Sequence, residues 1–285
     1  MRSVLITGTS KGIGYETAIA FARAGYCVHA TMRNPSRSPA LVEIAAKEKL
    51  PITVTAMDVD NDESVRAAVA DIQTQHRPVD VLVNNAGIEC FGSVEELSID
   101  EFRGVMETNY FGVLRCVKAV VPQMRKRRNG TIINISSVAG TFCHPPATPY
   151  CASKWALEAL SEGLACEMKS FGVRVVLVEP GIIDTAMARR ITANGKSAYP
   201  HAARIATHFA ATLNAAPVPP SSVAQKILEI AQGDTWQLRH PVGPDALPLM
   251  AWRKGFTDEQ WVDLHSADDQ THQRLMSTFT GKRPD

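Results

Sequence analysis

The stretch Thr7-Gly8-Thr9-Ser10-Lys11-Gly12-Ile13-Gly14 joins an apolar run typical of a β-strand, Ser3–Thr7, to a helical pattern at Ile13–Ala24. Its glycines allow a tight turn and a close approach to a pyrophosphate, and the helix start supplies N–H donors and partial positive charge. The spacing is G-x-x-x-G-x-G, and a glycine cluster by itself could be a tight turn only. The strand–turn–helix context favours a dinucleotide site. The residues expected to contact the cofactor here are Gly8, Ser10, Lys11, Gly12, Ile13 and Gly14.

Outward from this turn, short β-branched runs alternate with longer segments of helical period. The predicted strands are Ser3–Thr7, Cys27–Met32, Ile52–Ala56, Val79–Asn84, Gly130–Ile135 and Val173–Glu179, with a weaker one near Gln237–Pro241. The predicted helices are Ile13–Ala24, Pro39–Lys49, Asp62–Gln75, Ile99–Arg128, Pro149–Phe171 and Ser221–Gln232. Several strands are apolar on both faces, which indicates a parallel sheet covered by helices. The alternation predicts a Rossmann-type, doubly wound α/β fold of about seven strands, with helices on both faces.

The chain is expected to form a single domain over residues 1–285. Within it, residues 186–216 are predicted to form a lid over the substrate. Their Ala, Ile and Phe content suggests an apolar pocket or, equally, a segment that packs on the core. Residues 245–285 show no clear period and are expected to wrap the outside as a C-terminal extension.

The composition and net charge of the chain limit the classes of function that it is expected to have. The 285 residues are 45% hydrophobic and 21% charged, with a net charge of +1, which gives no support for a nucleic-acid or membrane-surface role. Six scattered cysteines lack C-x-x-C or zinc spacing, so free thiols and no metal site are expected. The N-terminal apolar run is too short for a signal peptide, and no apolar stretch is long enough to span a membrane. These features predict a cytoplasmic protein.

The end of the second strand bears on the choice of cofactor. A site for NAD usually carries an acidic residue there, to bond the ribose hydroxyls. This chain has Thr31-Met32-Arg33 instead. Arg33 by itself could be a solvated loop arginine, but Lys11 in the glycine turn adds a second cation. Two cations at these positions favour the 2′-phosphate of NADP(H).

Two further strand ends carry candidate cofactor contacts. Asp58 and Val59 follow the third strand, and Asp58 could accept from the adenine amino group or cap a nearby helix. Asn84-Asn85-Ala86-Gly87 ends the fourth strand. Small residues there permit contact with the cofactor ribose, while paired asparagines could equally tie two strands together. The predicted contacts in this segment are Asn85, Ala86 and Gly87.

Tyr150 and Lys154 are the candidate proton-handling pair. Their i, i+4 spacing places them on one face of a helix. A free tyrosine has a pKa of about 10, which a nearby ammonium and an oxidised nicotinamide ring would lower. Such pairs also recur on ordinary surface helices. Ser136-Ser137 ends the fifth strand, where a hydroxyl could bind the substrate oxygen or simply satisfy the strand end.

Taken together, Thr7–Gly14, Asn84–Gly87, Ser137, Tyr150–Lys154 and Pro180-Gly181 stand in the order and spacing of the short-chain dehydrogenase/reductase family. The chain resembles this family over roughly residues 1–240. The resemblance implies that Tyr150 is the acid/base and that Ser137 polarises the carbonyl. It implies that Lys154 binds the nicotinamide ribose and lowers the tyrosine pKa, and that Asn109 helps to hold a proton-relay water.

The resemblance also bears on cofactor and substrate. Val28–Arg33 looks like NADP(H)-preferring members, and the chain is similar to the 17β-hydroxysteroid and retinol dehydrogenase branch, including Gly243-Pro244-Asp245 in the tail. This implies a hydrophobic ketone, aldehyde or sterol-like substrate. In the family the turn after the sixth strand contacts the nicotinamide amide. The residues expected to do so here are Pro180, Gly181, Ile183 and Thr185.

The leading hypothesis is therefore an NADP(H)-dependent oxidoreductase that interconverts a carbonyl and an alcohol by hydride transfer. The alternative from another class is a non-catalytic NADP(H)-binding sensor on the same fold. A sugar-nucleotide epimerase or dehydratase is disfavoured because its usual G-x-x-G-x-x-G spacing is absent. The family uses the helices at Ile99–Arg128 and Pro149–Phe171 for assembly, which implies a homodimer or homotetramer. Glu89 is predicted to face the active-site side, and no role is assigned to it.

Overall fold

The computed structural model describes residues 1–75, 78–191 and 197–280, and a single parallel sheet organises them. The strand order is β3-β2-β1-β4-β5-β6-β7. The strands are β1 Ser3–Thr7, β2 Cys27–Met32, β3 Ile52–Ala56, β4 Val81–Asn84, β5 Gly130–Ile135, β6 Val173–Pro180 and β7 Arg239–Val242. Every residue of β6 is buried, as expected for a strand covered on both faces. The predicted doubly wound fold is confirmed.

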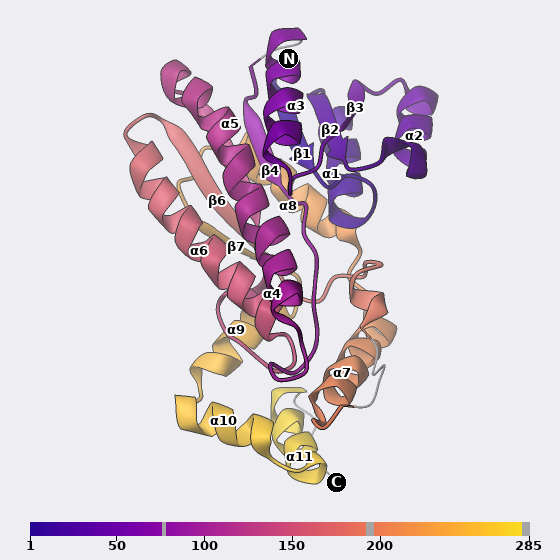
Figure 1. Cartoon of the computed structure of the whole chain (residues 1–285), viewed down its shortest axis with the longest axis vertical. Helices are drawn as coiled ribbons and strands as arrows, with labels where there is room; N and C mark the ends of the chain where they lie inside the picture. The colour runs from indigo at the N-terminus through magenta and orange to yellow at the C-terminus, as the bar shows by residue number, and fades with distance from the viewer. Residues whose placement is uncertain (76–77, 192–196, 281–285) are drawn as a thin grey trace.

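Helices cover both faces of this sheet (Figure 1). Apolar side chains of α1, α2 and α8 form one large core cluster with the strands, and those of α3, α5 and α6 form the other. The helices are α1 Gly12–Arg23, α2 Ala40–Glu48, α3 Asp62–Gln75, α4 Ile99–Met106, α5 Gly112–Arg127, α6 Thr148–Lys169 and α8 Pro220–Gln232. Most bounds differ from the sequence prediction by one or two residues at each end, because helix ends fray.

The long helix predicted at Ile99–Arg128 is interrupted. A single π-helical turn, η2 Glu107–Phe111, separates α4 from α5. At this turn the Asn109 amide bonds the backbone of Ile88, and Gly112 packs so closely on Val59 that an added Cβ would lie 2.9 Å from its side chain. These tertiary contacts stabilise the wider π-helical turn, and π-helical turns are common at functional sites.

The C-terminal extension is helical, although its sequence shows no clear period. It contains α9 Ala246–Lys254, α10 Asp258–Ser266 and α11 Asp269–Thr280, and residues 281–285 lie outside the described part. Leu249, Trp261 and Leu264 from these helices form a small separate core with Val138 and Phe142. Short helices with few apolar positions give a weak periodic signal, and their packing partners stand more than 100 residues away in the chain.

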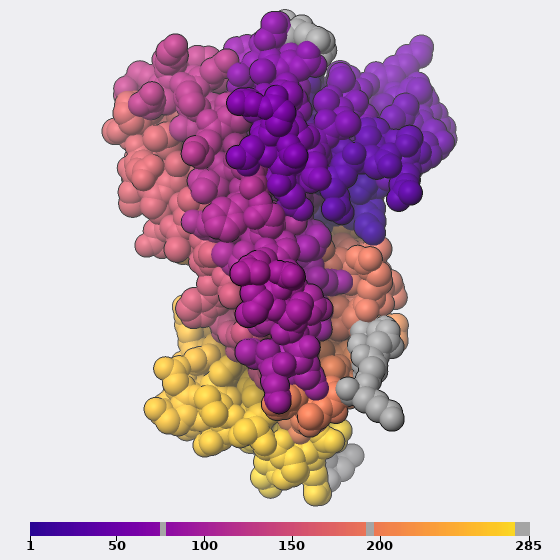
Figure 2. All heavy atoms as spheres, in the orientation of Figure 1, coloured from indigo at the N-terminus to yellow at the C-terminus, as the bar shows by residue number. Residues whose placement is uncertain are grey.

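The predicted lid at 186–216 begins with the short 3-10 helix η4 Ala188–Arg190 and ends in α7 His201–Ala215, and residues 192–196 are not described. Helix α7 and the C-terminal helices lie next to each other at one end of the molecule (Figures 1 and 2). None of the helices in the described part has both the length and the apolar character needed to cross a bilayer.

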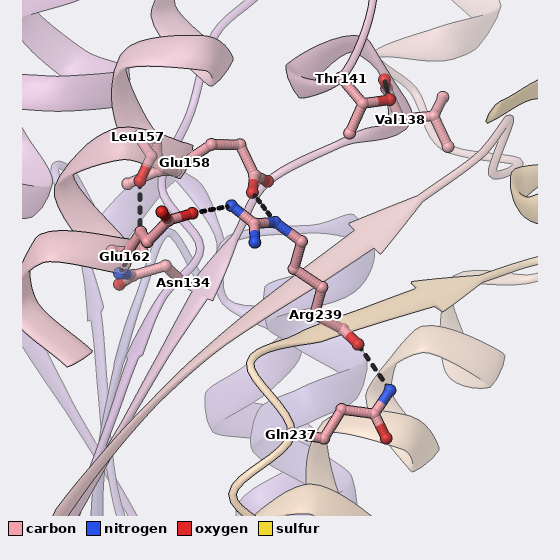
Figure 3. Close-up of polar contacts among 9 residues, drawn as sticks. Asn134, Val138, Thr141, Leu157, Glu158, Glu162, Gln237 and Arg239 are labelled. Carbon is pink, nitrogen blue, oxygen red and sulfur yellow. Dashed lines mark hydrogen bonds and ion pairs between the residues drawn. The ribbon is translucent and has the colours of Figure 1, made fainter. Parts of the chain in front are cut away.

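The edge strand β7 is tied to α6 by an ion-pair cluster. The Arg239 guanidinium lies between the carboxylates of Glu158 and Glu162, at 2.9 and 2.8 Å (Figure 3). Behind this pair, Glu179 of β6 is fully buried, and neither of its carboxylate oxygens has a hydrogen-bond partner among the described residues. Burial, followed by repulsion from Glu158, raises the pKa of Glu179 to about 7.

The raised pKa of Glu179 predicts how stability depends on pH. The folded carboxyl binds its proton more tightly than the unfolded one, so the free energy of unfolding should fall as pH rises from about 4.5 to about 7. Glu179→Gln should remove this loss and stabilise the protein at pH 7.5 by about 1 to 2 kcal/mol. Urea unfolding at pH 5 and pH 7.5 measures both effects. Glu162→Gln, on an exposed partner of the same arginine, is the control and should give no such gain. A lower stability of Glu179→Gln at pH 7.5 would contradict the prediction.

Candidate active site

A cleft of about 780 Å³ opens at the carboxyl ends of the strands, where the strand order reverses direction between β1 and β4. Ligands of open α/β sheets bind at this switch in strand order. The sequence-predicted residues that line the cleft are Gly8, Ser10, Lys11, Gly12, Ile13, Arg33, Asp58, Val59, Asn85, Ala86, Gly87, Ser137, Tyr150, Lys154, Pro180, Gly181, Ile183 and Thr185. Gly14 and Asn109 do not line it, and both act from behind the cleft wall.

The shape of the glycine turn allows other groups to approach its backbone closely. Gly8 has a φ of +71°, and an added Cβ would lie 2.7 Å from the Ala86 backbone. A Cβ on Gly14 would lie 2.4 Å from both the Asn85 amide and the Gly8 carbonyl oxygen, so Gly14 packs beneath the turn. The start of α1 has no acidic side chain and no side-chain cap. Its free N–H groups and partial positive charge fit a pyrophosphate.

Two cations border the part of the cleft next to β2. Arg33 and Lys11 are both exposed, line the cleft, and make no hydrogen bond or ion pair with any described residue. Asp58, by contrast, shapes its own loop, because its carboxylate accepts from the Asp60 N–H at 3.1 Å. Asn61, and not Asp58, caps α3. The exposed Arg33 guanidinium and Lys11 ammonium are therefore available to bind a phosphate group, whereas one carboxylate oxygen of Asp58 already accepts a hydrogen bond.

The paired asparagines at the end of β4 have structural contacts. Asn84 donates to the Asn134 side chain at 2.8 Å and so ties β4 to β5. Asn85 donates to the carbonyl oxygens of Thr7 and Gly8, at 2.8 and 3.0 Å, and holds the glycine turn. The strand-tying alternative is therefore correct for Asn84, while Asn85 supports the turn and also lines the cleft.

Tyr150, Lys154 and Ser137 meet at the cleft. The Ser137 and Tyr150 side chains line the same cleft, and the Lys154 ammonium lies 5.5 Å from the tyrosine ring centroid. Burial raises the pKa of Tyr150 and lowers the pKa of Lys154 to about 8. Lys154 Nζ donates to the Ile135 carbonyl at 2.8 Å and keeps two further N–H donors. A buried tyrosinate needs nearby positive charge, which Lys154 can supply.

Asn109 holds the site from behind. Its side-chain carbonyl accepts from the Ile88 N–H at 2.8 Å, and its amide donates to the Ile88 carbonyl and to the Ser153 hydroxyl, both at 2.9 Å. These bonds fix the segment after Gly87 to α6, the helix that carries Tyr150 and Lys154. The Asn109 side chain is therefore a positioning group for the site.

Two residues at the site, Glu89 and Asp245, have no role that the sequence assigned. Glu89 lines the cleft half-buried, and burial raises its pKa to about 7 against the opposing charges of Arg190 and Lys11. Asp245 accepts from the Ile182 N–H at 2.7 Å, and a Cβ on Gly181 would lie 2.2 Å from its carboxylate. Asp245 therefore sets the turn that contains Gly181. Its one sequence signal was the turn composition Gly243-Pro244-Asp245, since the contact spans 63 residues.

Comparison with known proteins agrees with this geometry. The sequence model of the short chain dehydrogenase family matches residues 2–196. Human retinol dehydrogenase 8 is 44% identical over 197 residues, which cover 67% of this chain and 62%, less than two thirds, of that protein. A short-chain dehydrogenase from Streptomyces avermitilis superposes with a TM-score of 0.77 at 30% identity, covering 98% of this chain and 97% of that one. A gluconate 5-dehydrogenase from Burkholderia cenocepacia, in complex with NADP and tartrate, gives a TM-score of 0.75 at 26% identity over 86% of this chain and 95% of that one.

Proposed function

The chain belongs to the short-chain dehydrogenase family, and from this premise we propose that it is an NADP(H)-dependent oxidoreductase that interconverts a carbonyl and an alcohol on a hydrophobic substrate. The observation that carries the proposal is that Ser137, Tyr150 and Lys154 line one cleft, with the buried Lys154 ammonium 5.5 Å from the tyrosine ring centroid. This group lies in the same cleft as the glycine turn.

The three side chains have complementary chemical roles. When bound, the nicotinamide supplies or accepts the hydride. In the reduction direction Tyr150 Oη donates its proton to the carbonyl oxygen, and the Ser137 hydroxyl hydrogen-bonds that oxygen as charge develops on it. Lys154 stabilises the tyrosinate that remains. In the oxidation direction the same tyrosine takes the alcohol proton.

The proposals for the cofactor and for the substrate class are based on the residues that line the cleft. Arg33 and Lys11 offer unpaired cations for a 2′-phosphate, and the Burkholderia neighbour is described in complex with NADP. Beyond Tyr150 the wall becomes apolar, with Phe91, Ile182 and Phe209. Apolar walls with a few convergent polar groups suit a hydrophobic ketone, aldehyde or sterol-like molecule.

The test is an assay of the purified protein with NADPH and a panel of ketones, aldehydes and sterols, followed by loss of absorbance near 340 nm. We expect oxidation of NADPH with at least one apolar carbonyl compound, and slower oxidation of NADH. Tight NADPH binding with no turnover on any member of the panel would favour the sensor and overturn the proposed activity.

The same helices that the family uses for assembly carry exposed apolar side chains here. Phe111 is 43% exposed and Trp155, on α6, is 51% exposed. Burial of such aromatic groups against a second copy would be favourable. We expect a homodimer or homotetramer, so light scattering should report a multiple of 31.0 kDa. A mass of one chain at micromolar concentration would contradict this.

A further inference from the structure

A second, smaller cavity of about 140 Å³ adjoins the catalytic group. Tyr150 and Ser137 are among the residues that line it. The other walls come from the segment after η3, the 3-10 helix Val138–Gly140, and from α7, α9, α10 and α11. The C-terminal extension therefore completes a compartment that opens onto the reacting groups.

The extension is fastened over this cavity by specific contacts. Trp261 of α10 donates to the Cys143 carbonyl at 2.8 Å, and its ring meets Phe142 edge-on at 5.8 Å. Arg204 of α7 donates to the carbonyls of His265 and Ala267. These bonds join the lid helix and the segment next to Tyr150 to the same C-terminal helices. The aromatic walls are thus held in place by the chain itself.

Five histidines line this one cavity, from four separate segments of the chain. They are His144, His201, His208, His265 and His272. Nowhere in the described ranges do three or more metal-ligating side chains have the arrangement of a metal site. His208 makes no hydrogen bond with a described residue, and the hydrogen bond between His144 Nδ1 and the carbonyl oxygen of its neighbour Pro145 is a long one, 3.5 Å. Their ring nitrogens are available to a ligand.

The charge state of these histidines restricts the charge of the ligand that the cavity can bind. Burial lowers the pKa of His144 to about 4 and also lowers the pKa of His208, so both rings are neutral at pH 7. A neutral imidazole offers one donor and one acceptor. Among the described residues, Arg204 is the one lysine or arginine that lines the cavity, and it is already bonded to Asp269 and two carbonyls. A carboxylate or phosphate would find no free cation here.

The volume of the cavity limits the size of the ligand. A cavity of about 150 Å³ with apolar walls is known to accommodate a benzene molecule, and the present one is similar in volume and walled by Phe142 and Trp261. We propose that this cavity binds a ring of the substrate that carries an uncharged hydroxyl or carbonyl oxygen, with His208 and His144 as the groups that recognise this oxygen. The assignment rests on the proposed oxidoreductase function, because it places the reacting carbonyl at Tyr150 and Ser137.

Three matched ketones test the assignment: 4-hydroxyacetophenone, 4-methylacetophenone and 4-acetylbenzoate. Their dissociation constants for the protein saturated with NADP⁺ are measured by calorimetry, and their turnover is measured with NADPH. We expect the hydroxy ketone to bind about fivefold to tenfold more tightly than the methyl ketone, as one net hydrogen bond allows, and the carboxylate to bind most weakly. Preference for 4-acetylbenzoate, equal affinity for all three ketones, or no binding of any of them would overturn the assignment.

Variants of His208 test whether this residue recognises the hydroxyl group of the ketone. His208→Phe keeps an aromatic ring but removes both polar atoms, so it should erase or reverse the preference for hydroxyl over methyl. His208→Gln keeps a donor and an acceptor and should retain it. The matched control is His240→Phe, because His240 lies on β7 outside the cavity and bonds the Gln237 carbonyl. If His208→Phe leaves the preference intact, the assignment fails. Selective binding without turnover would instead refute the proposed reductase while leaving the cavity assignment standing.

Discussion

Tyr150→Phe should lower kcat/KM for carbonyl reduction by about a thousandfold, within the range that loss of a positioned acid produces. The variant keeps the ring that packs beside Lys154 and removes only the hydroxyl proposed to donate the proton. NADPH affinity should change by less than about twofold, because the glycine turn and the β2 end are untouched. Stopped-flow NADPH oxidation gives the rate, and fluorescence titration gives the affinity.

A second tyrosine offers a matched control for this prediction. Tyr26 precedes β2 at the end of the sheet opposite the cleft, and its hydroxyl accepts one bond from Arg2 at 3.2 Å. Tyr26→Phe should retain full activity. If Tyr150→Phe is as active as Tyr26→Phe, the proton donor is another group and the proposed role of Tyr150 is wrong.

Arg33→Ala should weaken NADPH binding by about tenfold to a hundredfold while changing NADH binding by less than about twofold. Such a loss corresponds to removal of a charge-assisted contact between a guanidinium and a phosphate. Adding Lys11→Ala should weaken NADPH further, and the affinity of the wild type should fall with salt more steeply than that of the double variant. Dissociation constants for both cofactors at two ionic strengths measure these effects.

The control for the cofactor prediction is Arg37→Ala. Arg37 lies in η1, Pro35–Arg37, in the same loop after β2, but it does not line the cleft. Its loss should leave both dissociation constants unchanged. Equal weakening of NADPH and NADH by Arg33→Ala would remove the 2′-phosphate assignment and leave the arginine a general electrostatic role.

Local sequence signals located most of the cleft. The glycine turn, the small residues after β4 and the turn after β6 are short motifs at strand ends, and parallel strands bring such ends to one edge of the sheet. The i, i+4 spacing placed Tyr150 and Lys154 on one helix face, and both line the cleft. These residues are fixed by spacing within a few positions, so their arrangement follows once the strand order is set.

Other parts of the site depend on contacts between segments far apart in the chain. Asp245 reaches Ile182 across 63 residues, and Asn109 reaches Ser153 across 44. No periodicity connects such pairs, because each contact exists only after the strands and helices have packed. Glu89 gives a similar example, since its raised pKa comes from burial in the assembled cleft.

The glycine turn and the alternation of strands and helices thus determined the fold and the position of the cleft from sequence alone, and the family resemblance indicated the side chains proposed to react there. The tertiary structure alone decided what forms the smaller cavity beside that cleft. The C-terminal helices show little local pattern, yet Trp261 bonds Cys143 across 118 residues and brings histidines from four segments around one cavity. The physical reason is that the burial and charge of these side chains are set by the packed neighbours that surround them, which local sequence does not encode.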